Sequence, residues 1–254
     1  MPAARPAILT ASALVLAMAL GGCAAAESTA SPAPAPIGET VVEVSTDGPA
    51  ITGTGPTDPY PGVELPLREG MRSVTIDFEC DGGGPFRVEV GDSMALGQAP
   101  LRGTCDGTTT LVWPIGEETG PTLYVWVLDG VEWTATPHFS SAEFVQDDAI
   151  TAECEAFATT YSALWNADIG YTQYQAFDEA EWNRRVDAAT VELEVLVDSS
   201  ETSMTDSFAT LLAALRSESH VPGAMLTDTS GIDPISDTCD TNHSPLILTG
   251  EFGG

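Results

Sequence analysis

The 254-residue chain carries 38 acidic residues against 8 basic ones, all arginine, so its formal net charge at pH 7 is −30. Such a surface repels nucleic acid, anionic lipid and anionic wall polymers, which argues against all three as direct ligands. Hydrophobic residues make up 43% of the sequence, which is enough for a folded core and argues against a wholly disordered chain.

The first 22 residues have the features of a secretory signal peptide. Arg5 supplies a positive charge, and an uncharged, mostly apolar run extends from Ala7 to Leu20. This run is shorter than the roughly 20 apolar residues that span a bilayer. We therefore expect residues 1–22 to be removed.

The run Leu20-Gly21-Gly22-Cys23 follows directly and resembles the lipobox of bacterial lipoproteins. The resemblance implies cleavage before Cys23 and a diacylglyceryl group on its thiol, with attachment to the extracellular face of the cytoplasmic membrane. Two acyl chains suffice for stable attachment. The alternative is an ordinary secretory signal with a chance cysteine. Residues 23–38 would then be the lipidated cysteine and an extended Ala/Ser/Pro tether.

Residues 39–145 carry the signals of β structure. A first strand is expected at residues 41–44, before a proline-rich irregular stretch. Residues 73–80 alternate between apolar and polar, residues 81–84 are expected to turn the chain, and residues 86–90 alternate again. Short strands at this spacing predict an antiparallel β-sandwich-like domain. The apolar face of the first alternating stretch is Val74, Ile76, Phe78 and Cys80.

The strongest hairpin signal is residues 123–136, around Asp129-Gly130, a dipeptide favoured in type I′ turns. That register places Trp126 opposite Trp133 and predicts that the two rings touch in the core. The alternative is a surface platform on which sugars stack. Its members would be Trp113, Tyr124, Trp126 and Trp133.

Residues 146–254 change to helical spacing. Three apolar stripes predict a bundle of three amphipathic helices with a loop-rich tail, in which Asp233-Pro234 begins a further short helix. Asp178 with Glu181 resembles a capping box. Strands followed by helices indicate an α+β protein, and we expect two domains, 39–145 and 146–254. The stripes are Ile150, Cys154, Phe157, Tyr161 and Leu164; Trp182, Val186, Ala189, Leu193 and Leu196; and Met204, Phe208, Leu211, Leu212 and Leu215.

Four cysteines besides Cys23 suggest disulfides in an exported protein, and four cysteines allow three connectivities. Pairing within each region is the simplest solution, so we expect Cys80–Cys105 and Cys154–Cys239. Zinc is the competing interpretation, but the sequence contains no Cys-x-x-Cys spacing.

Neither a metal ion nor another cofactor is expected. The three histidines, His138, His220 and His243, are scattered along the chain. A weak calcium site near the C-terminal end is an alternative to a solvated acidic loop, although the EF-hand spacing is absent. Its residues would be Asp228, Asp233, Asp237 and Asp240.

The segment Gly91-Asp92-Ser93-Met94 resembles the start of GDSL-type esterases, and Asp240-Thr241-Asn242-His243 matches the Asp-x-x-His of that family. The resemblance implies Ser93 as nucleophile, His243 as base and Asp240 as the residue that orients the base. The family places this serine at a strand-to-helix turn, whereas a poor helix-forming stretch follows Ser93 here. We therefore favour a polar β-turn with a catalytically inert Ser93.

Several features together resemble uncharacterised lipoproteins of high-GC Gram-positive bacteria. They are the lipobox, the Cys80–Cys105 β region with Trp113-Pro114, and the cysteine-tied helical end closing in Gly253-Gly254. We expect a lipid-anchored, non-catalytic binding or structural module of the cell envelope. Its partner would be an envelope protein or carbohydrate. The alternative is a surface esterase that uses Ser93.

Overall fold

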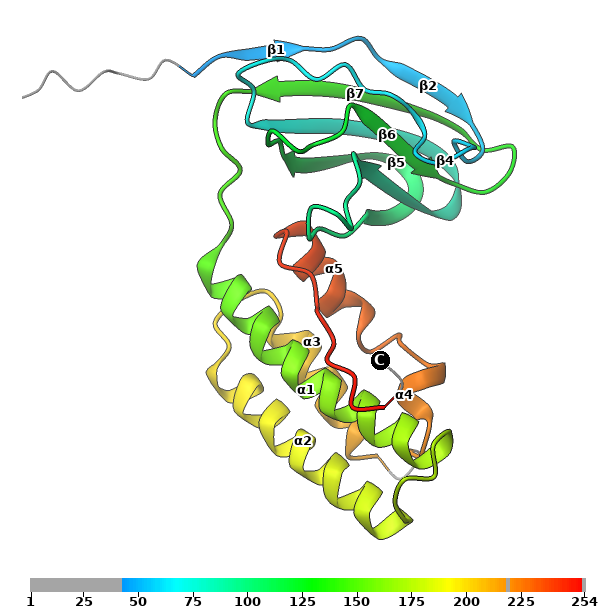
Figure 1. The fold of residues 1–254 in the computed structure, drawn as a ribbon, viewed down its shortest axis with the longest axis vertical. Helices are drawn as coiled ribbons and strands as arrows, with labels where there is room; N and C mark the ends of the chain where they lie inside the picture. The colour runs from blue at the N-terminus through cyan, green and yellow to red at the C-terminus, as the bar shows by residue number, and fades with distance from the viewer. Residues whose placement is uncertain (1–42, 218–219, 253–254) are drawn as a thin grey trace, which may run out of the picture. The chain divides into compact units, whose positions relative to one another are not determined.

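The computed structural model describes residues 43–217 and 220–252 (Figure 1). Strands come first along the chain and helices follow, which confirms the predicted α+β class. The signal peptide, Cys23 and the tether lie outside the described residues. Within the described part of the chain, no helix is both long and apolar enough to cross a bilayer.

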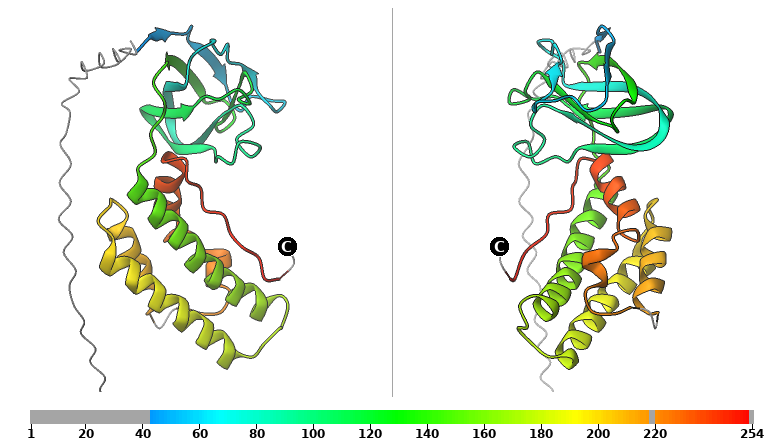
Figure 2. Two further views of the ribbon diagram at one scale, coloured as in Figure 1. Left: turned by 60° about the vertical axis from the view of Figure 1, so that its left-hand side comes forward. Right: turned by 90° about the vertical axis from the view of Figure 1, so that its right-hand side faces the viewer.

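Among residues 43–217 and 220–252, seven antiparallel strands form one curled sheet, a half-barrel (Figure 2). Strand β4 lies at its centre and pairs with β5, β6 and β7, while β1 and β2 pair with β7 and β3 pairs with β6. The strands are β1 Ser45–Asp47, β2 Ile51–Thr54, β3 Val63–Glu64, β4 Ser73–Val90, β5 Leu101–Pro114, β6 Thr122–Trp126 and β7 Glu132–Ser140.

The first strand begins at Ser45, later than the expected residues 41–44, of which residues 41 and 42 lie outside the described range. Its pairing with β7 places Ser45 opposite Ser140. Just before it, the Val44 N–H donates to Ser141 Oγ at 2.8 Å. The chain therefore enters the sheet beside the point where it leaves β7 for the helices.

The predicted alternation in β4 is confirmed, because its apolar positions all lie in one hydrophobic cluster. The Cys80–Cys105 disulfide joins β4 to β5 inside this cluster, and the rings of Phe78 and Phe86 lie 4.8 Å apart. The buried hydrophobic residues of β4 are Val74, Ile76, Phe78, Cys80, Phe86, Val88 and Val90.

The expected chain reversal at residues 81–84 is wrong. Strand β4 continues through it, with a shift of register against β5 between Asp81 and Pro85. Gly82 and Gly83 have φ of +125° and +72°, and Gly107 on β5 has φ of +132°. These values suit glycine, and because both strands are irregular at the same level, the pair bends together and curls the sheet.

The expected 123–136 hairpin is also wrong, since β6 and β7 pair with different halves of β4. Asp129-Gly130 does form a turn, in which the Val131 N–H donates to the Leu128 carbonyl at 3.1 Å. Only Gly130 has positive φ, +80°, which fits type II and not type I′. Type II turns splay the flanking strands, so β6 and β7 do not pair with each other and each pairs with β4 instead.

The expected contact between Trp126 and Trp133 is therefore wrong, because Trp126 lies opposite Arg87 and Trp133 opposite Cys80, seven positions apart on β4. Trp133 is 3% exposed, and its Nε1–H donates to the Gly55 carbonyl at 2.9 Å. Trp126 is only half-buried, because Leu123 and Val125 supply the core face of β6.

Five helices follow the sheet in the described part of the chain: α1 Asp148–Thr172, α2 Glu179–Ser199, α3 Thr205–Leu215, α4 Ala224–Thr227 and α5 Asp233–Thr241. The three predicted stripes pack into a second hydrophobic cluster. Asp147 accepts hydrogen bonds from the Ala149 and Ile150 N–H groups, and Asp178 accepts one from Glu181 N–H. These caps satisfy N–H groups that the first turn leaves free.

The expected second disulfide is also present, between Cys154 on α1 and Cys239 on α5. Both sulfurs lie inside the helical cluster. This bond holds the C-terminal part of the chain against the first helix.

Replacement of Trp133 by alanine should lower the free energy of unfolding by about 3–5 kcal/mol, because it empties a core site. Trp126→Ala is the matched control and should cost clearly less. Urea unfolding followed by circular dichroism measures both values. Equal losses would contradict the separate placement of the two rings.

Candidate functional site

Ser93 lies in the loop that follows β4 and is 1% exposed. Its backbone N–H donates to Glu89 Oε1 at 2.8 Å, and the Tyr60 hydroxyl donates to the same oxygen at 3.3 Å. Ser93 Oγ has no hydrogen-bond partner among the described residues. Gly91, at φ +69°, and the Asp92 carboxylate, which accepts from Ala95 N–H, shape the polar turn favoured from the sequence.

Asp240, the expected orienting acid, lies near the end of α5 and is 2% exposed. Its Oδ2 accepts a hydrogen bond from Arg102 Nη2 on β5 at 2.9 Å. Burial raises the pKa of Asp240 to about 6, and the nearby Arg102 guanidinium only partly opposes this shift. Arg102 Nε also lies 3.2 Å from Asp237 Oδ1, an ion pair whose geometry does not complete a hydrogen bond.

His243, the expected base, is 7% exposed and follows α5. Its Nε2–H donates to the Val112 carbonyl of β5 at 2.7 Å, and its ring packs edge-on against Phe144 at 4.8 Å. Burial lowers the pKa of His243, which favours the neutral ring. Nδ1 has no hydrogen-bond partner in the described part of the chain.

The structure does not assemble these residues into a catalytic triad. A triad needs one hydrogen bond from nucleophile to base and a second from base to acid. In the two described ranges no hydrogen bond joins the side chains of Ser93, His243 and Asp240 to one another. Asp240 instead bonds Arg102, and His243 bonds a backbone carbonyl.

The structure does bring Asp240 and His243 to one place, the contact between α5 and β5. Among the described elements, α5 is the only helix that contacts a strand. We call this contact, made by Arg102, Val112, Asp237, Asp240 and His243, the α5–β5 contact. No pattern in the sequence singles out Arg102, which occupies an ordinary polar position of a strand, or the carbonyl of Val112.

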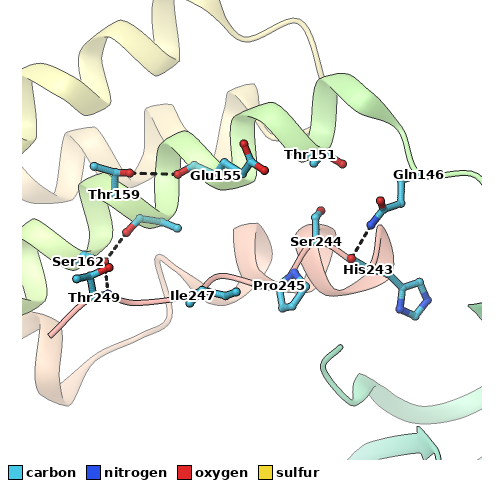
Figure 3. A pocket seen from close by; sticks show the side chains of 11 residues that line it. Gln146, Thr151, Glu155, Thr159, Ser162, His243, Ser244, Pro245, Ile247 and Thr249 are labelled. Atoms are coloured by element: carbon cyan, nitrogen blue, oxygen red, sulfur yellow. Dashed lines mark hydrogen bonds between the residues drawn. The ribbon is translucent and has the colours of Figure 1, made fainter. Parts of the chain in front are cut away.

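A second feature is a groove of about 650 Å³ between α1 and the extended segment His243–Thr249 (Figure 3). Hydroxyl groups line much of it, Glu155 is its one carboxylate, and Pro245 and Ile247 add apolar surface. Ile247 is 75% exposed. The ring of His243 points away from α1 in Figure 3, so the groove offers hydroxyl and apolar chemistry but no imidazole. The groove could not be predicted from the sequence, because the tail shows no periodic pattern.

Specific hydrogen bonds hold the extended segment along α1. At one end Gln146 Nε2 donates to the His243 carbonyl at 2.6 Å. At the other end Asn166 Nδ2 donates to the Thr249 carbonyl at 2.7 Å, while Thr249 N–H donates to Ser162 Oγ at 3.0 Å. Both walls of the groove, α1 and residues 243–249, are therefore held in place.

Of the four acidic residues considered for calcium, Asp233, Asp237 and Asp240 lie on α5 and Asp228 lies before it. Asp228 accepts a hydrogen bond from the Ser230 N–H at 3.0 Å, whereas Asp237 and Asp240 face Arg102. Residues 43–217 and 220–252 contain no group of three or more histidine, cysteine or acidic side chains placed to hold a metal ion.

Comparison with known proteins gives little further information. No protein-family model and no curated protein matches the sequence. A solved structure described as a Bacillus endospore appendage, from a family of disulfide-linked pili, matches with 12% identity and a TM-score of 0.25. The match covers 38% of this chain and 87% of that one. A TM-score this low does not establish a common fold.

Because Ser93 Oγ makes no hydrogen bond, Ser93→Ala should leave the free energy of unfolding unchanged or slightly raised. Ser162 is the matched control. It is also buried, but its Oγ donates to the Ala158 carbonyl at 2.7 Å and accepts from Thr249 N–H. Ser162→Ala should cost about 1–3 kcal/mol, since it leaves buried groups unpaired.

Thermal and urea unfolding of both variants provide the measurement. A large loss in Ser93→Ala with none in Ser162→Ala would reverse the assignment of which hydroxyl is bonded.

Proposed function

We propose that this chain is a secreted lipoprotein, anchored by lipid on Cys23, that acts outside the cytoplasm as a non-catalytic structural or binding module. The observation that carries the proposal is the pair of buried disulfides, one in each hydrophobic cluster. Disulfides of this kind form and persist in oxidising compartments, which indicates an extracytoplasmic location. The lipobox supplies the expected anchor.

The arrangement of polar side chains supports a non-catalytic role. The three residues that an esterase would use have their hydrogen-bonding groups committed elsewhere or buried without a partner. What the helical part offers instead is the groove along α1, with two fixed walls and mixed hydroxyl and apolar lining. Such a surface suits an uncharged carbohydrate or a peptide of an envelope protein. The high negative charge disfavours anionic partners.

The anchor is tested by Cys23→Ala, which should abolish incorporation of a palmitate analogue and release the protein from the membrane fraction. Loss of the thiol removes the only atom on that residue that can carry the diacylglyceryl group. Ser31→Ala, a change within the tether, is the control and should label as the unaltered protein does. A Cys23→Ala variant that still labels would refute the anchor.

The esterase alternative is tested by hydrolysis of short-chain nitrophenyl esters. The mature protein and Ser93→Ala should show the same background rate. Removal of a true nucleophile lowers turnover by several orders of magnitude. Robust activity that disappears in Ser93→Ala would therefore establish the esterase and overturn the non-catalytic proposal.

A further inference from the structure

The extended segment after α5 lies along α1 and is held there in the manner of a bound peptide (Figure 1). Residues 244–252 form neither helix nor strand, and residues 247–251 are exposed. The α1 side chains that bind this segment are buried, with Ser162 7% and Asn166 8% exposed. We call residues 249–252, Thr-Gly-Glu-Phe, the tail segment.

Two side chains of α1 bind the backbone of the tail segment. Ser162 Oγ accepts a hydrogen bond from the Thr249 N–H at 3.0 Å (Figure 3). The Asn166 amide makes two more, because its Nδ2 donates to the Thr249 carbonyl at 2.7 Å and its Oδ1 accepts from the Glu251 N–H at 2.8 Å. In an extended chain these three backbone groups point to the same side, so α1 supplies what a neighbouring strand would supply. Main-chain hydrogen bonds of this kind give affinity for an extended peptide.

The last two residues of the tail segment add selection by side chain. The Glu251 carboxylate pairs with two nitrogens of the Arg185 guanidinium on α2, at 2.7 Å and 3.3 Å. The Phe252 ring stacks on Tyr174, with centroids 5.6 Å apart, and its centroid lies 6.1 Å from that of Phe177. A bidentate pair with arginine favours a carboxylate, and the two rings favour an aromatic side chain after it.

Gly170 makes room for the aromatic ring. A Cβ at this position would lie 2.6 Å from Phe252 Cε2 and 2.7 Å from Phe177 Cε1, which is closer than carbon atoms pack. Ser162, Asn166 and Gly170 follow one another at intervals of four residues, so they lie along one face of α1. This face therefore combines hydrogen-bonding groups for an extended backbone with a space for a ring.

We propose that this face of α1, together with Arg185, Tyr174 and Phe177, is a peptide-binding site that takes the tail segment of a second copy of this chain in exchange for its own. The ligand class is an extended peptide in which glutamate precedes phenylalanine. A second copy supplies the same four residues, so the exchange keeps every contact of the site. The proposal depends neither on the lipid anchor nor on a ligand in the open groove, although Ser162 and Thr249 also line that groove.

The tail segment can leave its site without opening the hydrophobic core. Leu246 packs against the helical cluster, but Ile247 and Leu248, which follow it, are 75% and 38% exposed. Once released, residues 247–252 span about 20 Å when extended. That length lets them reach the site of a copy that lies against the same face of α1.

In a single copy the chain's own tail segment has the advantage, because tethering gives it an effective concentration on the order of millimolar. The unaltered protein should therefore be monomeric in dilute solution. Exchange should increase with protein concentration, and it should become complete where a copy cannot use its own tail segment.

Two complementary variants of the mature protein test the exchange. The double variant Glu251→Ala, Phe252→Ala leaves a site without its own ligand, and Asn166→Ala leaves a tail segment without its own site. Each alone should be monomeric by size-exclusion chromatography with light scattering, whereas an equimolar mixture should form a heterodimer. Gly170→Leu is a second site variant, which excludes the ring and keeps Asn166.

A labelled peptide of residues 246–252, Leu-Ile-Leu-Thr-Gly-Glu-Phe, measures the site directly by fluorescence anisotropy. It should bind the double variant, and a peptide ending in Ala-Ala should not. Adding Asn166→Ala to the double variant should weaken binding about tenfold or more, since two hydrogen bonds are lost. The matched control is Asn183→Ala, an exposed asparagine that donates to the Glu179 carbonyl of its own helix and should leave binding unchanged.

A mixture that stays monomeric would overturn the proposal even if the peptide binds, because the second copy would then not be the ligand. A heterodimer that still forms when both partners carry Glu251→Ala and Phe252→Ala would overturn it as well, since the association would not use the tail segment. Peptide binding that survives both Asn166→Ala and Gly170→Leu would refute the site. If Asn166→Ala folds poorly, the mixture with Gly170→Leu decides the exchange.

Discussion

The disulfide between Cys154 and Cys239 holds helix α5, and with it the start of the segment that follows, against α1. Helix α5 has only nine residues, which is too short for a stable helix on its own. The bond attaches it to the 25-residue α1 across a sequence separation of 85. In the chain-entropy description such a bond contributes about 4.6 kcal/mol. The α5–β5 contact and the groove along α1 both begin within four residues of Cys239.

The polar side chains buried near this bond cost stability in order to hold a particular arrangement. Asp240 and His243 are dehydrated, and the hydrogen bonds that they make do not fully offset that cost, as the shifted pKa values of both groups show.

The helical half could be predicted in detail because its signals are local. The spacing of the apolar residues, the cap at Asp178 and the start of α5 at Asp233-Pro234 all act within a few residues. The pairing of cysteines also followed, since each region holds two. The sheet was harder, because the partner of β6 and β7 is β4, whose residues lie tens of positions away. A turn dipeptide such as Asp129-Gly130 carries no information about the strand with which the flanking segments pair.

The candidate site was the least accessible to sequence reasoning. Asp240 and His243 were singled out as parts of a triad, and the structure does bring them together, but each bonds β5 instead. Their partners are 138 and 131 residues away along the chain. One partner is a strand arginine and the other a backbone carbonyl, which no side-chain pattern can show. Residue types in the right order are therefore weak grounds for a site when their separation is this large.

The pairing of β1 with β7 also determines how the protein would respond to a pulling force. The chain enters β1 and leaves β7 at the same end of the sheet, where Ser45 lies opposite Ser140. Tension applied between the tether and the helices would act on neighbouring ends of the antiparallel pair β1 and β7. Its hydrogen bonds would therefore break one after another and not all at once. That geometry resists force weakly. The load would be taken first by the three residues of β1 at the edge of the sheet and by the pairing of the same end of β7 with β4, where Ser140 lies opposite Ser73.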